Sequence, residues 1–113
     1  MTRSIPGRLH GLHLVLQEQF EQQNDELVRL AGFRTGAGTT ALSPRAIDEL
    51  TATARQALAE TAQALQRMND GTYGTCQHCG HGIPLERLEV LPSTRYCAHC
   101  QRYRTATQHT LTA

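Results

Sequence analysis

The sequence has 113 residues, a length that fits one small domain and excludes a multi-domain enzyme. Hydrophobic residues make up 39% of the chain and aromatic residues 4%, so burial of a thick apolar core cannot be the sole source of stability. The formal net charge is +1, which provides no long-range field to attract DNA or an anionic membrane surface.

The N-terminal region has no long apolar segment. No run in the sequence approaches the roughly 20 apolar residues that a membrane span needs. His10, His13 and Gln17 interrupt the first apolar stretch, so a signal-peptide core is not predicted. We therefore expect a cytoplasmic protein with no membrane partner, in which residues 1–7 form an N-terminal tail.

Apolar residues then recur three or four positions apart, except for a polar gap around Gln23, and form a heptad-like seam: Leu9, Leu12, Leu16, Phe20, Leu27 and Leu30. This spacing predicts a helix over residues 8–31. Three neighbouring apolar residues are expected to widen the seam: Leu14, Val15 and Val28. Gly32 is predicted to stop the helix, and the glycine-rich and threonine-rich stretch after it predicts a loop over residues 32–43.

A second helix is predicted over residues 44–70. Ser43 is suited to cap it, Pro44 to occupy its first turn, and Gly71 to follow its last residue. Its seam again has spacings of three or four: Ile47, Leu50, Ala54, Leu58, Thr61, Leu65 and Met68. Two seams of similar length joined by a short loop predict an antiparallel coiled-coil helical hairpin over residues 8–70.

The four cysteines form two pairs with the spacing of a zinc site. Cys76 and Cys79 are separated by two residues, as are Cys97 and Cys100, and seventeen residues lie between the pairs. Four thiolates complete a tetrahedral zinc shell and leave no position for water or substrate. We therefore predict one structural Zn²⁺ in a four-cysteine zinc-finger module, rather than a catalytic metal.

Other interpretations of the cysteines are weaker. A redox pair would need a strand-helix-strand framework that the sequence around Cys76 does not predict, and disulfides would need an oxidising compartment. The neighbouring His78, His81 and His99 could replace a cysteine as ligand, but four cysteines already fill the shell. We expect these imidazoles to be exposed knuckle side chains.

A cluster of arginines with interleaved tyrosines lies near the second cysteine pair: Arg95, Tyr96, Arg102, Tyr103 and Arg104. Mixtures of basic and aromatic residues can contact nucleic acid. The simpler interpretation is a solvated helix flank whose tyrosines pack on the zinc knuckle, and it is the one that we favour. Direct sequence-specific DNA binding is not expected.

Together these patterns predict a mainly α protein, with an antiparallel coiled-coil hairpin followed by a small four-cysteine zinc-finger module over residues 71–105 and a short C-terminal helix. Residues 106–113 are expected to form a C-terminal tail. With the zinc closed and no pairing of nucleophile and base in the sequence, we do not expect an enzyme.

The C-terminal third resembles the DksA/TraR family of bacterial zinc-finger transcription factors. The resemblance lies in the segment from Asp70 to Gly80 (DGTYGTCQHCG), the Arg87-Leu88-Glu89 block and the seventeen-residue interval before Cys97. It implies that the protein binds RNA polymerase directly and passes its coiled coil through the secondary channel towards the active site. It also implies regulation of transcription initiation without contact with promoter DNA.

The sequence departs from the family pattern at two places. Where the family's best-known member has an acidic Asp-Arg-Ala tip, this chain has glycine and alanine. The loop residues expected to meet the polymerase are Arg34, Thr35, Gly36, Ala37, Gly38, Thr39 and Thr40. Basic residues that the resemblance associates with guanosine tetraphosphate correspond here to Glu60, Leu91 and Gln101, none of which is basic.

A second hypothesis assigns the chain a different class of function. A zinc-stapled hairpin could act as a structural adaptor that pairs with a partner coiled coil or with a second copy of itself. The polar gap at Gln22 and Gln23 would then fix the register of the helices. On either hypothesis we expect a monomer or a weak dimer.

Overall fold

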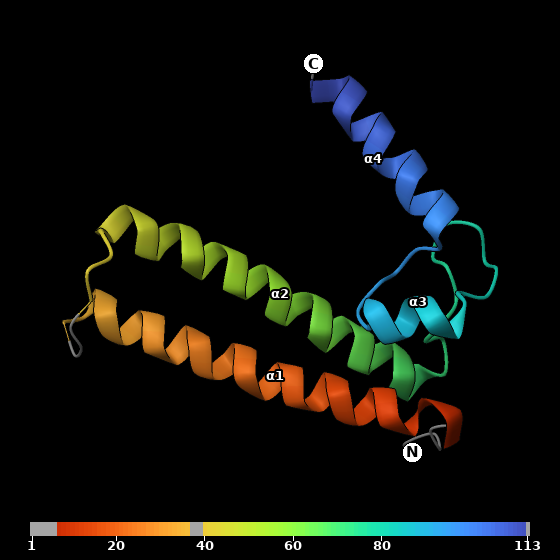
Figure 1. The fold of residues 1–113 in the computed structure, drawn as a ribbon, viewed down its shortest axis with the longest axis horizontal. Helices are drawn as coiled ribbons and strands as arrows, with labels where there is room; N and C mark the ends of the chain where they lie inside the picture. Colours follow the sequence, from red (N-terminus) through yellow and green to blue (C-terminus); the bar gives the residue numbers. More distant parts are fainter. Residues whose placement is uncertain (1–6, 37–39, 113) are drawn as a thin grey trace.

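The computed structural model describes residues 7–36 and 40–112 (Figure 1). It contains four helices, which are α1 (Gly7–Arg34), α2 (Pro44–Asp70), α3 (Leu85–Val90) and α4 (Ala98–Thr112). In these described ranges the β pairing is limited to one isolated antiparallel bridge, between Thr75 and Gly82. The predicted fold class, a helical hairpin followed by a four-cysteine module and a C-terminal helix, is confirmed.

Helices α1 and α2 lie side by side and antiparallel, whereas α4 leads away from the hairpin, so that the molecule has an open V shape (Figure 1). The short helix α3 lies near the end of α2 that is opposite the hairpin loop. The molecule measures 47 × 42 × 24 Å along its principal axes. None of the helices in the described part of the chain is both long and apolar enough to cross a membrane.

Helix α1 continues through Arg34, so the prediction that it ends at Ala31 is wrong by three residues. The amide of Thr35 still donates to the carbonyl of Ala31, at 3.1 Å, and thereby carries the helical hydrogen bonding past Gly32. The chain turns instead at Gly36, whose φ of 80° is left-handed. A glycine inside a helix costs about 1 kcal/mol, an amount that contacts of the following turn with α2 can offset.

Helix α2 covers the residues expected from the sequence. The side chain of Ser43 accepts a hydrogen bond from the amide of Ala46 at 3.1 Å, which satisfies one of the free N–H groups of the first turn. Pro44 lies in that turn, and at the other end the amide of Gly71 donates to the carbonyl of Met68. Both ends of the helix are therefore set by local sequence.

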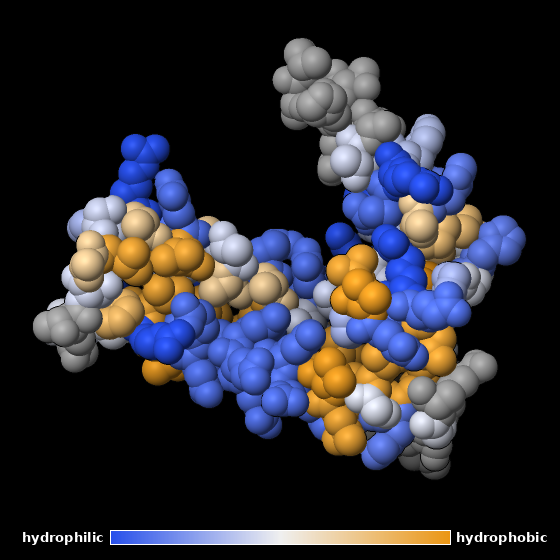
Figure 2. Space-filling model, viewed as in Figure 1, coloured by the Kyte–Doolittle hydropathy of each residue, from blue (hydrophilic) through white to orange (hydrophobic). Residues whose placement is uncertain are grey.

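The hairpin seam buries fewer residues than its pattern suggests. Among the described residues, those buried between the arms are Leu12, Leu16, Leu30, Ile47, Thr61, Ala64 and Met68. The expectation that neighbouring apolar residues widen the seam is wrong, because Leu14, Val15 and Val28 are 53%, 41% and 65% exposed. Orange patches on the surface in Figure 2 show that apolar side chains do reach solvent along the hairpin.

The main core lies where the hairpin meets the zinc module. It joins Leu12, Leu16, Ala64 and Met68 from the two long helices with residues of the module: Tyr73, Cys76, Ile83, Leu88 and Cys100. The base of the hairpin and the module therefore share one core, whereas the half of the hairpin nearer the loop depends on the pairing of α1 with α2 alone.

Helix α4 is longer than expected. The prediction of a C-terminal tail over residues 106–113 is wrong for most of that range, because the helix runs to Thr112. No glycine or proline follows Pro92 in the sequence, so once the second cysteine pair has started the helix nothing in the chain ends it early.

Candidate functional site: a four-cysteine metal centre and its junction with the hairpin

The first cysteine pair lies on a tight knuckle held by backbone hydrogen bonds. The amide of Gly80 donates to the carbonyl of Cys76 at 2.9 Å, and the amide of Cys76 donates to the carbonyl of His81 at 2.8 Å. Gly80 has a φ of 78°, which other residues rarely adopt. The turn therefore needs a glycine directly after Cys79, as the sequence has.

The second cysteine pair lies at the start of α4. Cys97 precedes the helix, Cys100 is in its first turn, and the amide of Gln101 donates to the carbonyl of Cys97 at 2.9 Å. A separate bond from the amide of Gln77 to the carbonyl of Arg95, at 2.8 Å, ties the two knuckles together. The partial positive charge of a helix N-terminus favours thiolates at this place.

The four sulfur atoms form one cluster. All four Sγ atoms lie within 4.8 Å of one another, and those of Cys79 and Cys97 are 3.9 Å apart. A tetrahedral zinc ion with Zn–S distances of about 2.3 Å would place its sulfurs about 3.8 Å apart, so the spacing fits this metal. Cys76 and Cys100 are buried on the inner side of the cluster, whereas Cys79 is exposed. One zinc ion in a closed, structural shell is the cofactor of this chain.

The protonation of the thiols also depends on their surroundings. Burial favours the neutral thiol of Cys76, but hydrogen bonds from the backbone of Cys79, Cys97 and His78 outweigh it and hold the pKa of Cys76 at about 5. Burial and the neighbouring thiols raise the pKa of Cys100 to about 12. Zinc must therefore displace protons from the cluster, and its affinity falls as the pH is lowered.

The histidines near the knuckles do not belong to the cluster. Within the described residues, the group that could hold a metal contains the four cysteines and neither His78, His81 nor His99, all of which are exposed. The His78 ring stacks on that of Tyr103, with the ring centroids 6.2 Å apart. The expectation that these imidazoles are exposed agrees with their positions.

Sequence reasoning missed the residue that connects the module to the hairpin. Arg67 lies in the last turn of α2 and is only 8% exposed. Its Nη2 atom donates to the carbonyls of Ser93 and Thr94, each at 3.3 Å. The available signal was its position, since Arg67 follows Ala64 by three residues and therefore falls on the apolar face of the helix.

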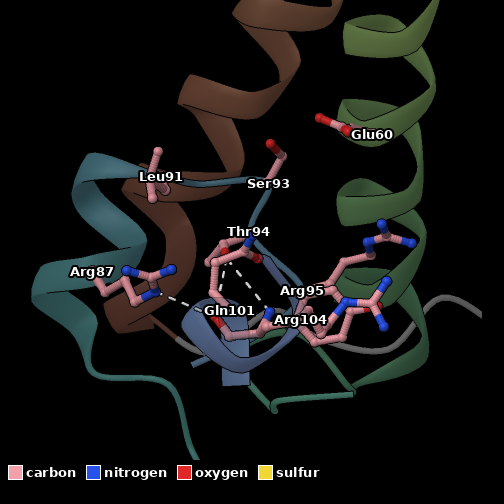
Figure 3. A pocket seen from close by; sticks show the side chains of 9 residues that line it. Glu60, Arg87, Leu91, Ser93, Thr94, Arg95, Gln101 and Arg104 are labelled. Atoms are coloured by element: carbon pink, nitrogen blue, oxygen red, sulfur yellow. Dashed lines mark hydrogen bonds between the residues drawn. The ribbon is translucent and has the colours of Figure 1, made fainter. Parts of the chain in front are cut away.

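A hollow of about 420 Å³ opens between α2, α3 and the start of α4 (Figure 3). Its lining includes Glu60, Leu91 and Gln101, the three residues that the resemblance associates with guanosine tetraphosphate. They lie far apart in the sequence, yet the structure brings them to one place. The basic groups of the hollow come from other positions: Arg87, Arg95 and Arg104.

The arginine and tyrosine cluster is partly packed into this hollow. The guanidinium carbon of Arg104 lies 4.4 Å from the ring centroid of Tyr96, and that of Arg95 lies 5.3 Å from it. Tyr96 packs against the core, whereas Tyr103 is 62% exposed. Tyr96 thus packs against the core that contains Cys76 and Cys100. Tyr103 instead stacks on His78 of the first knuckle and stays largely exposed.

At the other end of the hairpin the two arms are joined by an ion pair. Arg34, the last residue of α1, pairs with Asp48 in the first turns of α2. The hydroxyl of Thr35 donates to the carbonyl of Gly32 at 3.1 Å, and that of Thr40 accepts from the amide of Leu42 at 3.2 Å. The other predicted loop residues, Ala37, Gly38 and Thr39, lie outside the described residues.

Comparison with known proteins identifies the module. Residues 71–106 match the prokaryotic dksA/traR C4-type zinc finger. General stress protein 16O of Bacillus subtilis is 49% identical over 47 residues, which are 42% of this chain and 29% of that protein. The RNA polymerase-binding transcription factor DksA of Caulobacter vibrioides is 38% identical over 47 residues, which are 42% of this chain and 33% of that protein. The matched stretches thus span about a third of these curated relatives.

The fold is similar over a larger part of the chain. The structure of transcription factor DksA2 from Pseudomonas aeruginosa superposes with a TM-score of 0.74 over 90% of this chain and 86% of that chain, at 20% identity. This likeness shows a shared fold that includes the hairpin. The resemblance noted in the sequence is confirmed for residues 71–106, which match the dksA/traR C4-type zinc finger.

Proposed function

We propose that this protein is a bacterial transcription regulator, without enzymatic activity of its own, that binds RNA polymerase directly and inserts its hairpin into the secondary channel. The observation that carries the proposal is the presence in one chain of the dksA/traR zinc finger and a hairpin with the DksA2 fold. A relative that shares the zinc finger is named as an RNA polymerase-binding transcription factor. The protein would act in the cytoplasm, where its partner works.

The hairpin has the length needed to reach into a channel. Helix α2 has 27 residues, which at 1.5 Å per residue form a rod of about 40 Å. Only its base shares a core with the zinc module, so the loop end is free to enter a partner. We assign the loop residues 34–40 to contact with the polymerase and the zinc module to the rim of the channel.

The loop end offers polar groups and little free charge. Arg34 is paired with Asp48, and the described loop residues beyond it are Thr35, Gly36 and Thr40. The loop itself has no acidic residue, so it has no carboxylate to bring directly to a catalytic magnesium ion. We infer that it regulates by occupying the channel and not by acting on the metal at the active site.

The zinc ion would fix the angle at which the module leaves the hairpin. Cys76 and Cys100 hold the ion from the side that faces the shared core, and α4 begins at the second cysteine pair. Loss of the metal would therefore release the module from its fixed orientation, so that the module and the hairpin could no longer contact the polymerase together.

The hollow beside α2 bears on whether the protein responds to guanosine tetraphosphate, because its lining contains the three positions that align with basic residues of the family's best-known member. Its three guanidinium groups would attract phosphate, although Glu60 opposes an anion and none of the three aligned positions is basic. We infer a weak response. Polymerase binding measured with and without the nucleotide tests this, because a change of more than about tenfold would show that the relocated arginines form a full site.

The main test is equilibrium binding of the zinc-loaded full chain to purified RNA polymerase. A matched variant replaces residues 35–40 by glycine and serine at the same length and leaves the Arg34–Asp48 pair intact. We expect both proteins to bind, with the variant altering transcription from a test promoter more than affinity. Absence of binding at micromolar polymerase would overturn the proposal.

One observation favours the adaptor hypothesis as a second candidate. Leu14, Val15 and Val28 on α1 are largely exposed, and an apolar helix face can pair with another helix. Sedimentation of the isolated chain at increasing concentration measures self-association. A tight dimer that blocks polymerase binding would favour this candidate, whereas a monomer would favour the regulator.

A further inference from the structure

Arg67 is a buried charge without a carboxylate partner. It is 8% exposed, and no acidic side chain forms an ion pair with it among the residues that the structure describes. Burial and the nearby Arg95 lower the pKa of its guanidinium, although an arginine stays protonated even in such surroundings. A buried charge is expensive to desolvate, so its position requires an explanation other than simple core packing.

The hydrogen bonds of Arg67 run to a single segment. Its guanidinium reaches the carbonyls of Ser93 and Thr94, 26 and 27 residues further along the chain. The hydroxyl of Tyr73 donates to the adjacent carbonyl of Pro92 at 2.8 Å. Two side chains from the end of α2 and the start of the module therefore hold three consecutive carbonyls of residues 92–94.

The backbone of Arg67 also holds the residues that follow α2. The amides of Thr72 and Tyr73 donate to the backbone carbonyl of Arg67, at 2.9 and 3.2 Å. The side chain that holds Ser93 and the backbone that orients Tyr73 thus belong to one residue. Tyr73 and Arg67 form a single clamp around residues 92–94.

The clamped segment leads directly into the part of the chain that sets the shape of the molecule. Ser93, Thr94, Arg95 and Tyr96 form one wall of the hollow between α2 and α4 (Figure 3), and Cys97 then leads into α4. Arg87 adds a hydrogen bond from its Nε atom to the carbonyl of Tyr96, at 3.2 Å, on the α3 side. A displacement of residues 92–94 would move the wall and α4 together.

We propose that Arg67 is a positioning residue, which sets the direction of α4 and the wall of the hollow relative to the hairpin by holding residues 92–94 against the end of α2. The effect on the polymerase rests on the function proposed above, since a hairpin and a rim contact must be presented together to one partner. The effect on the shape of the molecule does not depend on that function.

A purely stabilising role predicts a different outcome from a positioning role. Replacement of a buried ion pair by apolar side chains of similar volume is often neutral or stabilising, because the cost of desolvating the charges is removed, and Arg67→Met removes such a cost without leaving an unpaired carboxylate. Ser93 and Thr94 are half-buried, so water can satisfy their carbonyls once the guanidinium is gone. Arg67→Met should therefore keep the melting temperature while the segment loses its fixed position.

The test uses the zinc-loaded full chain and three variants, Arg67→Met, Arg67→Lys and the matched control Arg55→Met, which removes an exposed arginine from the same helix. In Arg67→Met we expect hydrogen exchange of residues 91–97 to be about tenfold faster and small-angle scattering to show a broader range of distances, with zinc content unchanged. Arg67→Lys should restore part of the protection, because an ammonium can still reach a carbonyl. Arg55→Met should match the parent protein.

Two results would overturn the inference. One is unchanged exchange and scattering in Arg67→Met, and the other is a fall in melting temperature of more than about 10 °C with faster exchange throughout the chain, which would assign Arg67 to global stability. If Arg67→Met does not fold, Tyr73→Phe tests the other half of the clamp by the same measurements.

Polymerase binding supplies an independent arm of the experiment. If the parent protein binds, Arg67→Met should bind about fivefold to tenfold more weakly, while Arg55→Met binds normally. If the parent protein does not bind, the proposed function fails, but exchange and scattering still decide whether Arg67 positions α4. Equal affinity of the two methionine variants would limit the role of Arg67 to the shape of the free protein and would refute its effect on the partner.

Discussion

The hairpin and the zinc module of this protein are held together by different means. The hairpin depends on the antiparallel pairing of α1 with α2, which is about 40 Å long. The module contains α3 and the start of α4, and its chain is organised by four sulfurs and a set of backbone hydrogen bonds around the buried Tyr73, Ile83 and Leu88. A single substitution should therefore remove only part of the stability of the hairpin, whereas loss of one ion should unfold the module.

The difference has a structural consequence at the junction. Leu12 and Leu16 of α1 belong to the same buried core as Cys76 and Cys100, so the metal site also anchors the base of the hairpin. The loop end has no such anchor and depends on Leu30, Ile47 and the ion pair. We expect stability to decrease from the zinc end towards the loop.

Removal of a metal ligand should have the largest effect. Cys97→Ser leaves three thiolates for a metal that requires four ligands, so zinc content should fall from one ion per chain to none and residues 71–105 should unfold. Metal analysis and circular dichroism measure the two losses. His99→Ser, which changes an exposed knuckle residue outside the cluster, is the control and should keep its zinc. A Cys97→Ser protein with full zinc content would refute the assignment of the metal site.

Truncation in the shared core should have the next largest effect. Leu16 is 0% exposed, so Leu16→Ala should lower the free energy of unfolding by about 3 kcal/mol through the lost burial and the cavity left behind. Leu14→Ala, two residues away and 53% exposed, should cost less than about 0.5 kcal/mol. Urea denaturation of the zinc-loaded proteins measures both. Similar values for the two variants would show that the face of α1 is wrongly assigned.

Loss of the cap at the loop end should have a smaller effect. Ser43→Ala removes the acceptor for the amide of Ala46 and should cost about 1 kcal/mol, whereas Ser43→Gly should cost only a few tenths. Thermal unfolding distinguishes the variants. If the loop end separates before the rest of the molecule, the cap variant will show faster hydrogen exchange near residue 47 and little change in global melting.

The ion pair at the loop end should contribute least. The side chains of Arg34 and Asp48 are 54% and 60% exposed, and solvent screens pairs of this kind. A double-mutant cycle with Arg34→Ala and Asp48→Ala should give a coupling energy below about 1 kcal/mol that decreases in high salt. A coupling energy above about 2 kcal/mol would contradict this expectation and would mean that the ion pair is held rigidly and is poorly screened by solvent.

The features that could be predicted from the sequence are those that depend on local chemistry. Ser43, Pro44 and Gly71 mark the ends of α2, and the spacing of the four cysteines predicts the metal site without knowledge of the fold. The end of α1 could not be predicted in this way, because Gly32 and Gly36 are equivalent stop signals in the sequence. Hydrogen bonding from Thr35 to Ala31 and contacts with the second arm decide between them.

Features that depend on contacts between distant parts of the chain could not be predicted from the sequence either. The sequence places Arg67 on the apolar face of α2, but it does not reveal the carbonyls of residues 93 and 94 that accept hydrogen bonds from its guanidinium. The exposure of Leu14 and Val28 also could not be read from the pattern, because a seam of given spacing does not reveal how wide a face the partner helix covers. The hollow combines residues from three helices and a loop, and only the fold brings them together.

At the end of the hairpin, the two helices are terminated independently of the loop that joins them. The first arm ends at Arg34 and the second begins at its own cap, Ser43, so each helix is completed before the loop is reached. Extra residues inserted between these points would lengthen the loop without shifting the register of the seam, and the entropic cost of closure grows only slowly with length. The loop can therefore be exchanged without altering the two helices, and a hairpin that carries a grafted acidic loop would test how the loop affects the function proposed above.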